Sequence, residues 1–441
     1  MAVGPGRRVP FNVVDEVVHL LDSDTEPWSI QLEVRVGGTL HEDRLRAAVT
    51  EAALRHPMAR ARRAPAGRRG GHRYEWDIGP GPELDPLRVV DCPDDASLDA
   101  ARAGLQSRAV PLTESPPLRL LLARNPGGDV LMVNANHAAM DGVGTLRLVR
   151  SVARAYAGEP DPAPDLDPIE ARDVSMLVDL DNRRVRRRRW AMLAGKGRDV
   201  VVPPARLAPD GGRDAPGYGL HHVRLPADLT RRLVESDLPG TVNDVLLATL
   251  LLTVETWNDE HGAPAGRISV MVPVSMRPGE WRHEVVGNLI LPVRVSTTKR
   301  HRSTPLAAVE EVAEQSRGIK EGGGAGALVE VLGRSPSFPL RVKEATSPAL
   351  RALTRRLADT AMLSNLGRLD EPPSFGTDAG ETTEVWFSGP ARMPLGLSVG
   401  VVTAAGRLHA VFRYRHPQFG HDAARRFAER TVATLDSLLG P

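Results

Sequence analysis

The stretch NANHAAMDG, residues 134–142, decides the fold that this sequence predicts. It follows an apolar run, residues 130–133, that is typical of a buried strand, and it precedes a segment with helical apolar spacing. His137 carries an imidazole whose ordinary pKa lies near neutral pH, and Asp141 follows four residues later. The stretch therefore predicts either a catalytic histidine between a strand and a helix or a structural histidine in a loop.

The composition is that of a folded globular protein. Of the 441 residues, 41% are apolar and 25% are charged, which excludes a disordered or fibrous chain, and the length favours two domains or one duplicated unit. The net charge of +2 argues against a general binder of polyanions. The aromatic content of 4% argues against a platform for stacked nucleic-acid bases. We therefore expect no nucleic-acid partner.

Cysteine usage and hydropathy predict a cytoplasmic protein. The single cysteine, Cys92, excludes an internal disulfide and a cysteine-based zinc site, and it has no base near it in the sequence. The first ten residues lack the apolar core of a secretory signal. The longest apolar run, Val245–Val254, is too short to cross a bilayer and contains two threonines. We expect no membrane span and no bound metal.

Strands and helices alternate in both halves of the chain, which predicts an α/β (α+β) fold. The patterns predict strands over 28–36, 117–123, 220–225 and 268–274, helices over 41–55, 96–108, 241–259, 305–320 and 423–439, and a hairpin over 396–414. Pro- and Gly-rich segments between residues 160 and 215 mark a boundary. We therefore predict an N-terminal subdomain over 1–175, a crossover linker over 176–215 and a C-terminal subdomain over 216–441.

The linker contains an arginine run, residues 183–189. Because the overall charge is balanced, a solvated helix face is the prediction for this run. A contact with phosphate, including the phosphopantetheine of a carrier partner, is the alternative. Further along, three glycines at 322–324 predict a mobile loop.

Several motifs resemble one enzyme superfamily. Residues 136–142, NHAAMDG, resemble the HHxxxDG motif of the condensation-domain and chloramphenicol acetyltransferase-like acyltransferases. Residues 241–248 (TVNDVLLA), 272–277 (VPVSMR), 286–288 (VGN) and 364–367 (SNLG) resemble later motifs, in the same order, of the wax ester synthase/diacylglycerol acyltransferase and actinobacterial free-standing condensation enzyme branches. These motifs span most of the chain.

The resemblance implies both a fold and a mechanism. It implies two chloramphenicol acetyltransferase-like subdomains in a V-shaped pseudo-dimer with a central tunnel. His137 is then the general base that deprotonates the acceptor, and Asp141 pairs with Arg277 to hold the loop rigid. Gly142 permits a tight turn. Four residues are implied only as possible oxyanion or tunnel polar groups: Ser275, Asn288, Ser364 and Asn365.

One residue departs from the family motif. Asn136 stands where the first histidine of the pair is usual, while the second histidine is kept as His137. We interpret Asn136 as a structural substitute, because its amide both donates and accepts hydrogen bonds. Members of the superfamily with altered motifs include cyclising and binding proteins, so this class stays open.

Two rival motifs carry less weight. Residues 396–400, GLSVG, match the GxSxG elbow of serine hydrolases, but a hairpin is predicted there in place of the strand, turn and helix that the elbow requires. His221 and His222 are adjacent on a predicted strand, so their side chains point to opposite faces and do not form a metal pair.

The sequence thus predicts an acyltransferase that moves groups other than aminoacyl groups, in specialised or lipid metabolism. The donor is a thioester, either acyl-CoA or a phosphopantetheinyl acyl or peptidyl carrier protein, and no cofactor is permanently bound. The acceptor is a small molecule with a hydroxyl or amine, and the protein is a monomer. The alternative is a condensation-like protein that cyclises or only binds a carrier-tethered intermediate.

Overall fold

The computed structural model describes most of the chain. It describes residues 6–65, 72–162, 165–174, 176–177, 187, 203–211, 217–279, 284–321, 329, 338–356 and 358–440, without the side chains of 350–356. Most of the arginine run 183–189, the glycines 322–324 and much of the linker 176–215 lie outside these residues.

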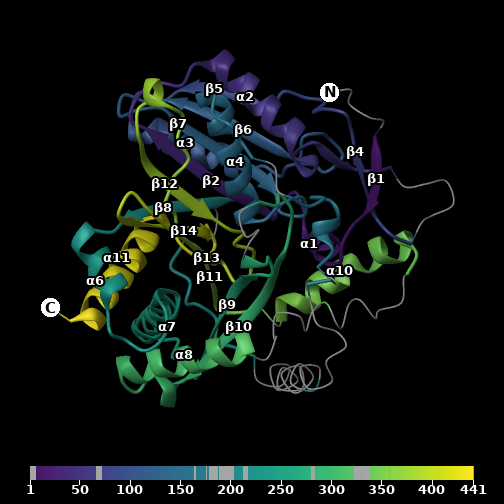
Figure 1. The fold of residues 1–441 in the computed structure, drawn as a ribbon. Helices are drawn as coiled ribbons and strands as arrows, with labels where there is room; N and C mark the ends of the chain where they lie inside the picture. Colours follow the sequence, from purple (N-terminus) through teal and green to yellow (C-terminus); the bar gives the residue numbers. More distant parts are fainter. Residues whose placement is uncertain are drawn as a thin grey trace.

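The first half is built around a five-stranded sheet with the strand order β12-β2-β7-β6-β5, and a three-stranded sheet, β1-β4-β3, lies beside it (Figure 1). The elements from this half are β1 (Arg7–Pro10), α1 (Val13–Leu21), β2 (Ser29–Val36), α2 (Glu42–Arg55), β3 (Ala61–Arg63), β4 (Glu75–Ile78), β5 (Leu87–Asp91), α3 (Asp95–Gln106), β6 (Leu118–Arg124), β7 (Val130–Asn136) and α4 (Gly142–Ala157).

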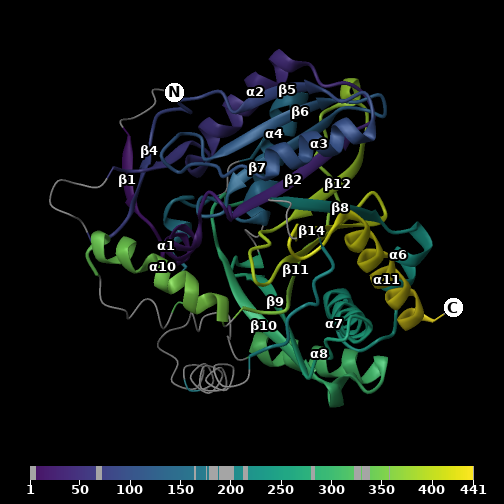
Figure 2. The same ribbon diagram turned by 180° about the vertical axis from the view of Figure 1, so that it is seen from behind.

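Both faces of the five-stranded sheet are covered by helices, which explains why every residue of β7 is buried. On one face, Leu121, Val130 and Met132 pack with Leu98 of α3 in a small separate core. On the other face the sheet packs with α2 and α4. Figure 2 shows the sheet from behind, with α3 against it. The strand that leads to the motif is therefore held from both sides.

The second half is built around a six-stranded sheet with the order β10-β9-β11-β13-β14-β8. Its elements are β8 (Tyr218–Arg224), α6 (Ala227–Glu235), α7 (Val242–Glu260), β9 (Arg267–Ser275), β10 (Ile290–Thr298), α8 (Pro305–Glu321), α10 (Leu340–Arg356), β11 (Ala361–Arg368), β12 (Thr382–Ser388), β13 (Leu397–Ala404), β14 (Arg407–Arg415) and α11 (His421–Leu439).

Two elements of the second half cross over to the first. Strand β12 pairs antiparallel with β2 and so completes the sheet of the first half. Helix α10 packs against α1, where Lys343 Nζ donates to Glu16 Oε1 at 2.6 Å and Ser347 Oγ donates to the Leu20 carbonyl at 3.0 Å. The predicted subdomain boundaries separate the two large sheets, but β12 and α10 belong by contact to the other side.

The main secondary-structure predictions are confirmed. The predicted helix over 41–55 is α2, and its apolar stripe, including Leu45 and Val49, is buried. The predicted helix over 241–259 is α7, and it begins with a capping box in which the Thr241 amide donates to Asp244 Oδ2 at 2.8 Å. The predicted hairpin over 396–414 is β13 and β14. Among the helices of the described residues, none is long and apolar enough to span a bilayer.

Candidate active site

A short loop between β7 and α4 carries His137. The Asn136 carbonyl accepts hydrogen bonds from the amides of Ala139 at 3.0 Å and Met140 at 3.3 Å, which closes the loop tightly. The His137 amide donates to the carbonyl of Trp28, the residue before β2, at 2.9 Å. The backbone of His137 is thus fixed by its own loop and by the neighbouring strand.

The His137 imidazole is half-buried beside the indole of Trp28, whose ring centroid lies 6.2 Å away. Burial lowers the pKa of His137 below its ordinary value, although the Asp141 carboxylate and nearby backbone groups act in the opposite direction. The neutral imidazole is therefore the main form at neutral pH. A neutral imidazole is the form that accepts a proton from an acceptor hydroxyl or amine.

The carboxylate of Asp141 is fully engaged with the protein. Its Oδ2 atom accepts from Arg277 Nη1 at 2.7 Å and from the Leu289 amide at 2.8 Å. Its Oδ1 atom accepts from the Gly144 amide at 2.8 Å, which makes Asp141 the N-cap of α4. Both side chains of the ion pair are completely buried. The pairing of Asp141 with Arg277 that the resemblance implies is present in the structure.

The segment 285–289 of the second half forms further hydrogen bonds with Arg277 and with the His137 loop. Arg277 Nη2 donates to the carbonyls of Val285 at 3.1 Å and Gly287 at 3.0 Å, and the Gly287 carbonyl also accepts from the Asp141 amide at 3.1 Å. Asn288 Nδ2 donates to the His137 carbonyl at 2.8 Å. The His137 loop therefore lies at the junction of the two halves and is bonded to both.

No protein-family model matches the sequence. The uncharacterised protein Rv2305 of Mycobacterium tuberculosis is 35% identical over 437 residues, which is 96% of this chain and 98% of the relative. The chain belongs to the same family as this mycobacterial protein.

Solved structures establish the fold. The first condensation domain of the calcium-dependent antibiotic synthetase superposes with a TM-score of 0.73 at 18% identity, covering 98% of this chain and 96% of that domain. The epimerization domain of tyrocidine synthetase B gives a TM-score of 0.70 at 16% identity, covering 99% and 97%. The chain has the condensation-domain fold. The predicted fold class is therefore confirmed, and the tunnel between the subdomains stays a prediction.

Asn136, the departure from the condensation-domain motif, is built into the core. Its Nδ2 atom donates to Asp22 Oδ2 at 3.0 Å and to the Val110 carbonyl at 2.8 Å, and its Oδ1 atom accepts from the Ala138 amide at 2.9 Å. Burial raises the pKa of its partner Asp22 to about 6. These three hydrogen bonds of the Asn136 side chain hold the start of the His137 loop in place, and none of them involves the imidazole of His137.

Gly142 requires a correction. The resemblance implies a tight turn here, but Gly142 is the first residue of α4 and is not among the glycines with positive φ. A Cβ atom at this position would lie 2.6 Å from Phe387 Cε2 and 2.9 Å from Leu366 Cδ2. Glycine is needed because β12 and β11 approach the start of the helix closely, rather than for the turn.

We expect Gly142→Ala to destabilise the protein by about 1–3 kcal/mol, because the added methyl group overpacks a filled site. Urea denaturation measures the change. Gly104→Ala is the matched control, since Gly104 lies within α3 and a Cβ there meets nothing within 4 Å. That control should stabilise the protein by about 0.5–1 kcal/mol. Equal effects of the two substitutions would show that the contact with Phe387 does not matter.

The four residues that the resemblance implies as oxyanion or tunnel polar groups lie in different surroundings. Asn288 has no exposed surface, and its side-chain Nδ2 atom donates to the backbone carbonyl of His137. This contact positions the His137 loop, and the Nδ2 atom does not point to an oxyanion. Ser275 Oγ accepts from the Arg277 amide at 3.4 Å, beside the ion pair. Ser364 and Asn365 lie on β11, where Asn365 Oδ1 accepts from the Gly367 amide at 2.7 Å. The next residue, Leu366, approaches Gly142, so this motif does reach the start of α4.

Three residues of the site belong to none of the sequence motifs. Trp28 packs near the imidazole, Asp22 accepts from Asn136, and Phe387 fills the space beside Gly142. Each is far from the motif in the sequence and belongs to no pattern with fixed spacing. The approach of Trp28 and Phe387 follows from the pairing of β2 with β7 and with β12.

The GxSxG match and the pair of adjacent histidines have structural roles in the sheet of the second half. Ser398 of the GxSxG match lies inside β13, completely buried and paired with Arg413 of β14, which contradicts a nucleophile elbow. His222 packs edge-on against Trp386 with ring centroids 4.9 Å apart. No group of three or more metal-ligating side chains occurs in the described part of the chain. Cys92 is buried, and burial raises the pKa of its thiol.

Proposed function

We propose that this protein is an acyltransferase that moves an acyl group, other than an aminoacyl group, from a thioester to a hydroxyl or amine. One observation carries the proposal: the His137 imidazole is only partly buried and burial lowers its pKa, while its backbone is bonded to both halves and the Asp141 carboxylate is occupied by other partners. A single neutral base held rigidly at the junction suits general-base catalysis.

The proposed reaction is a direct transfer. The imidazole of His137 removes the proton from the acceptor oxygen or nitrogen as that atom attacks the thioester carbonyl. The tetrahedral intermediate then collapses, the carbon–sulfur bond breaks, and the imidazolium returns the proton to the leaving thiolate. The roles of Asp141, Gly142, Arg277 and Asn136 are structural, because their contacts fix the loop and do not reach the reacting atoms.

The donor, acceptor and setting belong to the same proposal. The donor is acyl-CoA or a phosphopantetheinyl acyl or peptidyl carrier protein, in line with the peptide synthetase domains that share the fold. No permanently bound cofactor is required by this chemistry. The protein acts as a cytoplasmic monomer in specialised or lipid metabolism. A cyclising or purely binding protein is the alternative, because Asn136 departs from the family motif.

A panel of acyl thioesters tests the proposal. The purified protein is incubated with acetyl, octanoyl and dodecanoyl thioesters of CoA and of a phosphopantetheinylated carrier protein, together with small amines and alcohols or a cell extract. Mass spectrometry should reveal esters or amides of the offered acyl group. Products that have lost water within one substrate would support the cyclising alternative, and thioester binding without any product would support the binding one.

We expect the acid limb of kcat/KM to lie below pH 6.5. A general base must be neutral, and burial lowers the pKa of His137 from its ordinary value of 6.5, so the active form persists to lower pH. Rates are measured from pH 8 to 5 with a reactive thioester. Asp22→Asn is the control, because the pKa of Asp22 is about 6 and it also titrates in this range. A limb that disappears in Asp22→Asn would assign it to Asp22 instead.

A further inference from the structure

Arg413 of β14 carries a buried positive charge at the junction of the two halves. The preceding residue, Phe412, packs against Phe427 of α11, so Arg413 points to the opposite face of the sheet, which packs against β12 (Figure 1). There its Nη1 atom donates to the carbonyls of Ser29 at 3.2 Å and Gly389 at 3.3 Å. The guanidinium therefore joins the sheet of the second half to the start of β2.

No carboxylate of the described residues pairs with Arg413. Each of the other buried arginines in this part of the chain forms an ion pair with an acid: Arg102 with Glu33, Arg147 with Asp161, Arg172 with Asp15, Arg277 with Asp141 and Arg302 with Glu255. The charged group near Arg413 is instead Arg415, and both lie over the ring of Tyr218, 4.4 and 4.6 Å from its centroid.

The guanidinium of Arg413 remains charged at neutral pH. Burial lowers its pKa to about 10, which still leaves the protonated form dominant. Its Nε and Nη2 atoms are buried and form no hydrogen bond with the described residues. Water can accept hydrogen bonds from such atoms, but it carries no charge, and the loss of hydration by a buried ion is best offset by an opposite charge.

Two serine hydroxyls lie beside this guanidinium. Ser398 of β13 pairs with Arg413 in the antiparallel register, so both side chains lie on the same face of the sheet. A Cβ atom at Gly389 would lie 3.8 Å from Ser398 Oγ, so this hydroxyl and the guanidinium flank the same residue. The hydroxyls of Ser398 and Ser29 are buried and have no hydrogen-bond partner among the described residues. The surroundings of Arg413 therefore offer donors and no negative charge.

Burial limits the size of any ligand at this position. Arg413 and Ser398 are 0% exposed, and Ser29 is 1% exposed. An extended substrate cannot lie along side chains that are enclosed in this way. A small ion with one negative charge matches one guanidinium, and N–H and O–H groups are the donors that bind an anion.

We propose that Arg413 and Ser398, together with the hydroxyl of Ser29, bind a small monovalent anion such as chloride. The anion neutralises the buried guanidinium and connects β13 and β14 with the start of β2. Because Ser29 pairs with Asn136 in the register of β2 and β7, the site supports the strand pair that leads to the His137 loop. The inference goes beyond the proposed acyl transfer and does not depend on it.

Thermal unfolding at constant ionic strength tests the site without a substrate. Sodium chloride replaces sodium gluconate, whose anion is too large for the site, at a total of about 0.2 M, so that surface charges are screened equally. The melting temperature of the wild type should rise by about 2 °C or more relative to that of Arg413→Met, because an anion that binds only the folded protein stabilises it. The comparison with Arg413→Met cancels the general effect of each salt, and equal responses of the two proteins would overturn the site.

Two further variants show whether the response belongs to this charge. Arg413→Lys keeps the cation and should retain a response to chloride. Arg302→Met removes a buried arginine that already pairs with Glu255, and it should respond as the wild type does although its melting temperature is lower. A response that is lost in Arg302→Met as well would follow from lower stability and would overturn the assignment to Arg413.

Ser398→Ala gives a second test that leaves the charge in place, and it serves also if Arg413→Met does not fold. Loss of one donor should weaken chloride binding about threefold or more, which moves the midpoint of the chloride titration to higher concentration. An unchanged midpoint would remove Ser398 from the site.

Crystals grown with bromide in place of chloride locate the ion directly. We expect an anomalous peak beside Nε or Nη2 of Arg413, and its absence would overturn the site whatever the variants show.

Discussion

Substitution of His137 by alanine is expected to lower kcat about 10²–10⁴-fold, the range that a positioned general base contributes. The fold should be preserved, because the contacts that hold this residue are made by its backbone. Its amide donates to the Trp28 carbonyl, and its carbonyl accepts from Asn288 Nδ2. The measurement is turnover of a thioester substrate, together with the melting temperature of the same preparation.

A matched histidine variant makes this result specific. His221→Ala removes another half-buried imidazole, from β8 in the second half, and should leave turnover within a factor of about two. Retention of near wild-type turnover by His137→Ala would refute the general-base role. A loss of turnover that is accompanied by unfolding would point instead to a structural histidine.

The second large effect is expected on stability, when the buried ion pair between Asp141 and Arg277 is broken. Asp141→Asn leaves the buried guanidinium of Arg277 without its counter-charge, and we expect a loss of about 3–5 kcal/mol in the free energy of unfolding. The side chain of asparagine still offers an oxygen to the Gly144 amide, so the N-cap of α4 is largely retained. Denaturation in urea measures the loss.

The double variant Asp141→Asn/Arg277→Met separates charge from shape. Removing both charges should restore most of the lost stability, because the cost of the single variant is mainly the unpaired buried cation. Catalysis should recover less, since the Arg277 contacts with the carbonyls of Val285 and Gly287 are also lost. A single variant whose stability lies within about 0.5 kcal/mol of the wild type would contradict a buried, dehydrated pair.

Much of the local structure near the motif is predictable from the sequence, for physical reasons. Strand β7 is a continuous apolar run because both of its faces are covered, and α2 shows its buried stripe at spacings of three and four. These patterns are local. The pairing of Asp141 with Arg277 joins residues 136 positions apart, and only the resemblance to a family implies it.

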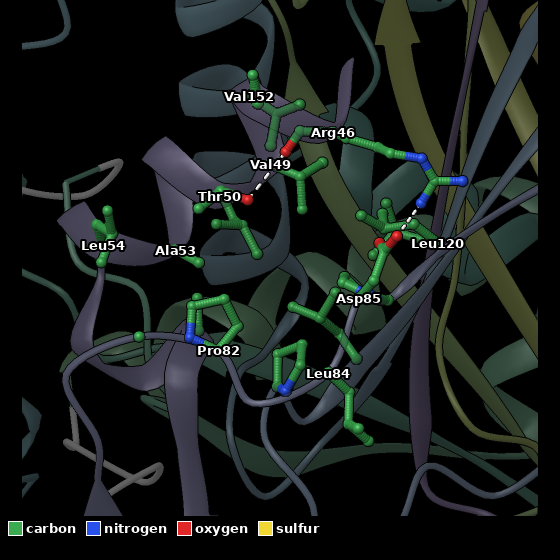
Figure 3. Close-up of a pocket in the computed structure, with 18 of the residues that line it drawn as sticks. Arg46, Val49, Thr50, Ala53, Leu54, Pro82, Leu84, Asp85, Leu120 and Val152 are labelled. Carbon is green, nitrogen blue, oxygen red and sulfur yellow. Dashed lines mark hydrogen bonds and ion pairs between the residues drawn. The ribbon is translucent and has the colours of Figure 1, made fainter. Parts of the chain in front are cut away.

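The remainder depends on contacts that no local pattern specifies. The need for glycine at 142 is set by Phe387, a side chain on a strand that arrives from the far end of the chain. Helix α10 contains Pro348, which locally predicts a helix end rather than a helix interior. An apolar cavity lined by α2, α4, the segment 81–86, β6 and β7 likewise depends on how these separate segments pack together (Figure 3).

Strand β12 has a consequence for biosynthesis. Until residues 382–388 have been synthesised, β2 has no partner on one side, although seven of its eight residues are buried in the finished protein. An unpaired strand edge is a template for misassociation. During translation the edge of β2 therefore stays open until a strand encoded near the end of the message has been made.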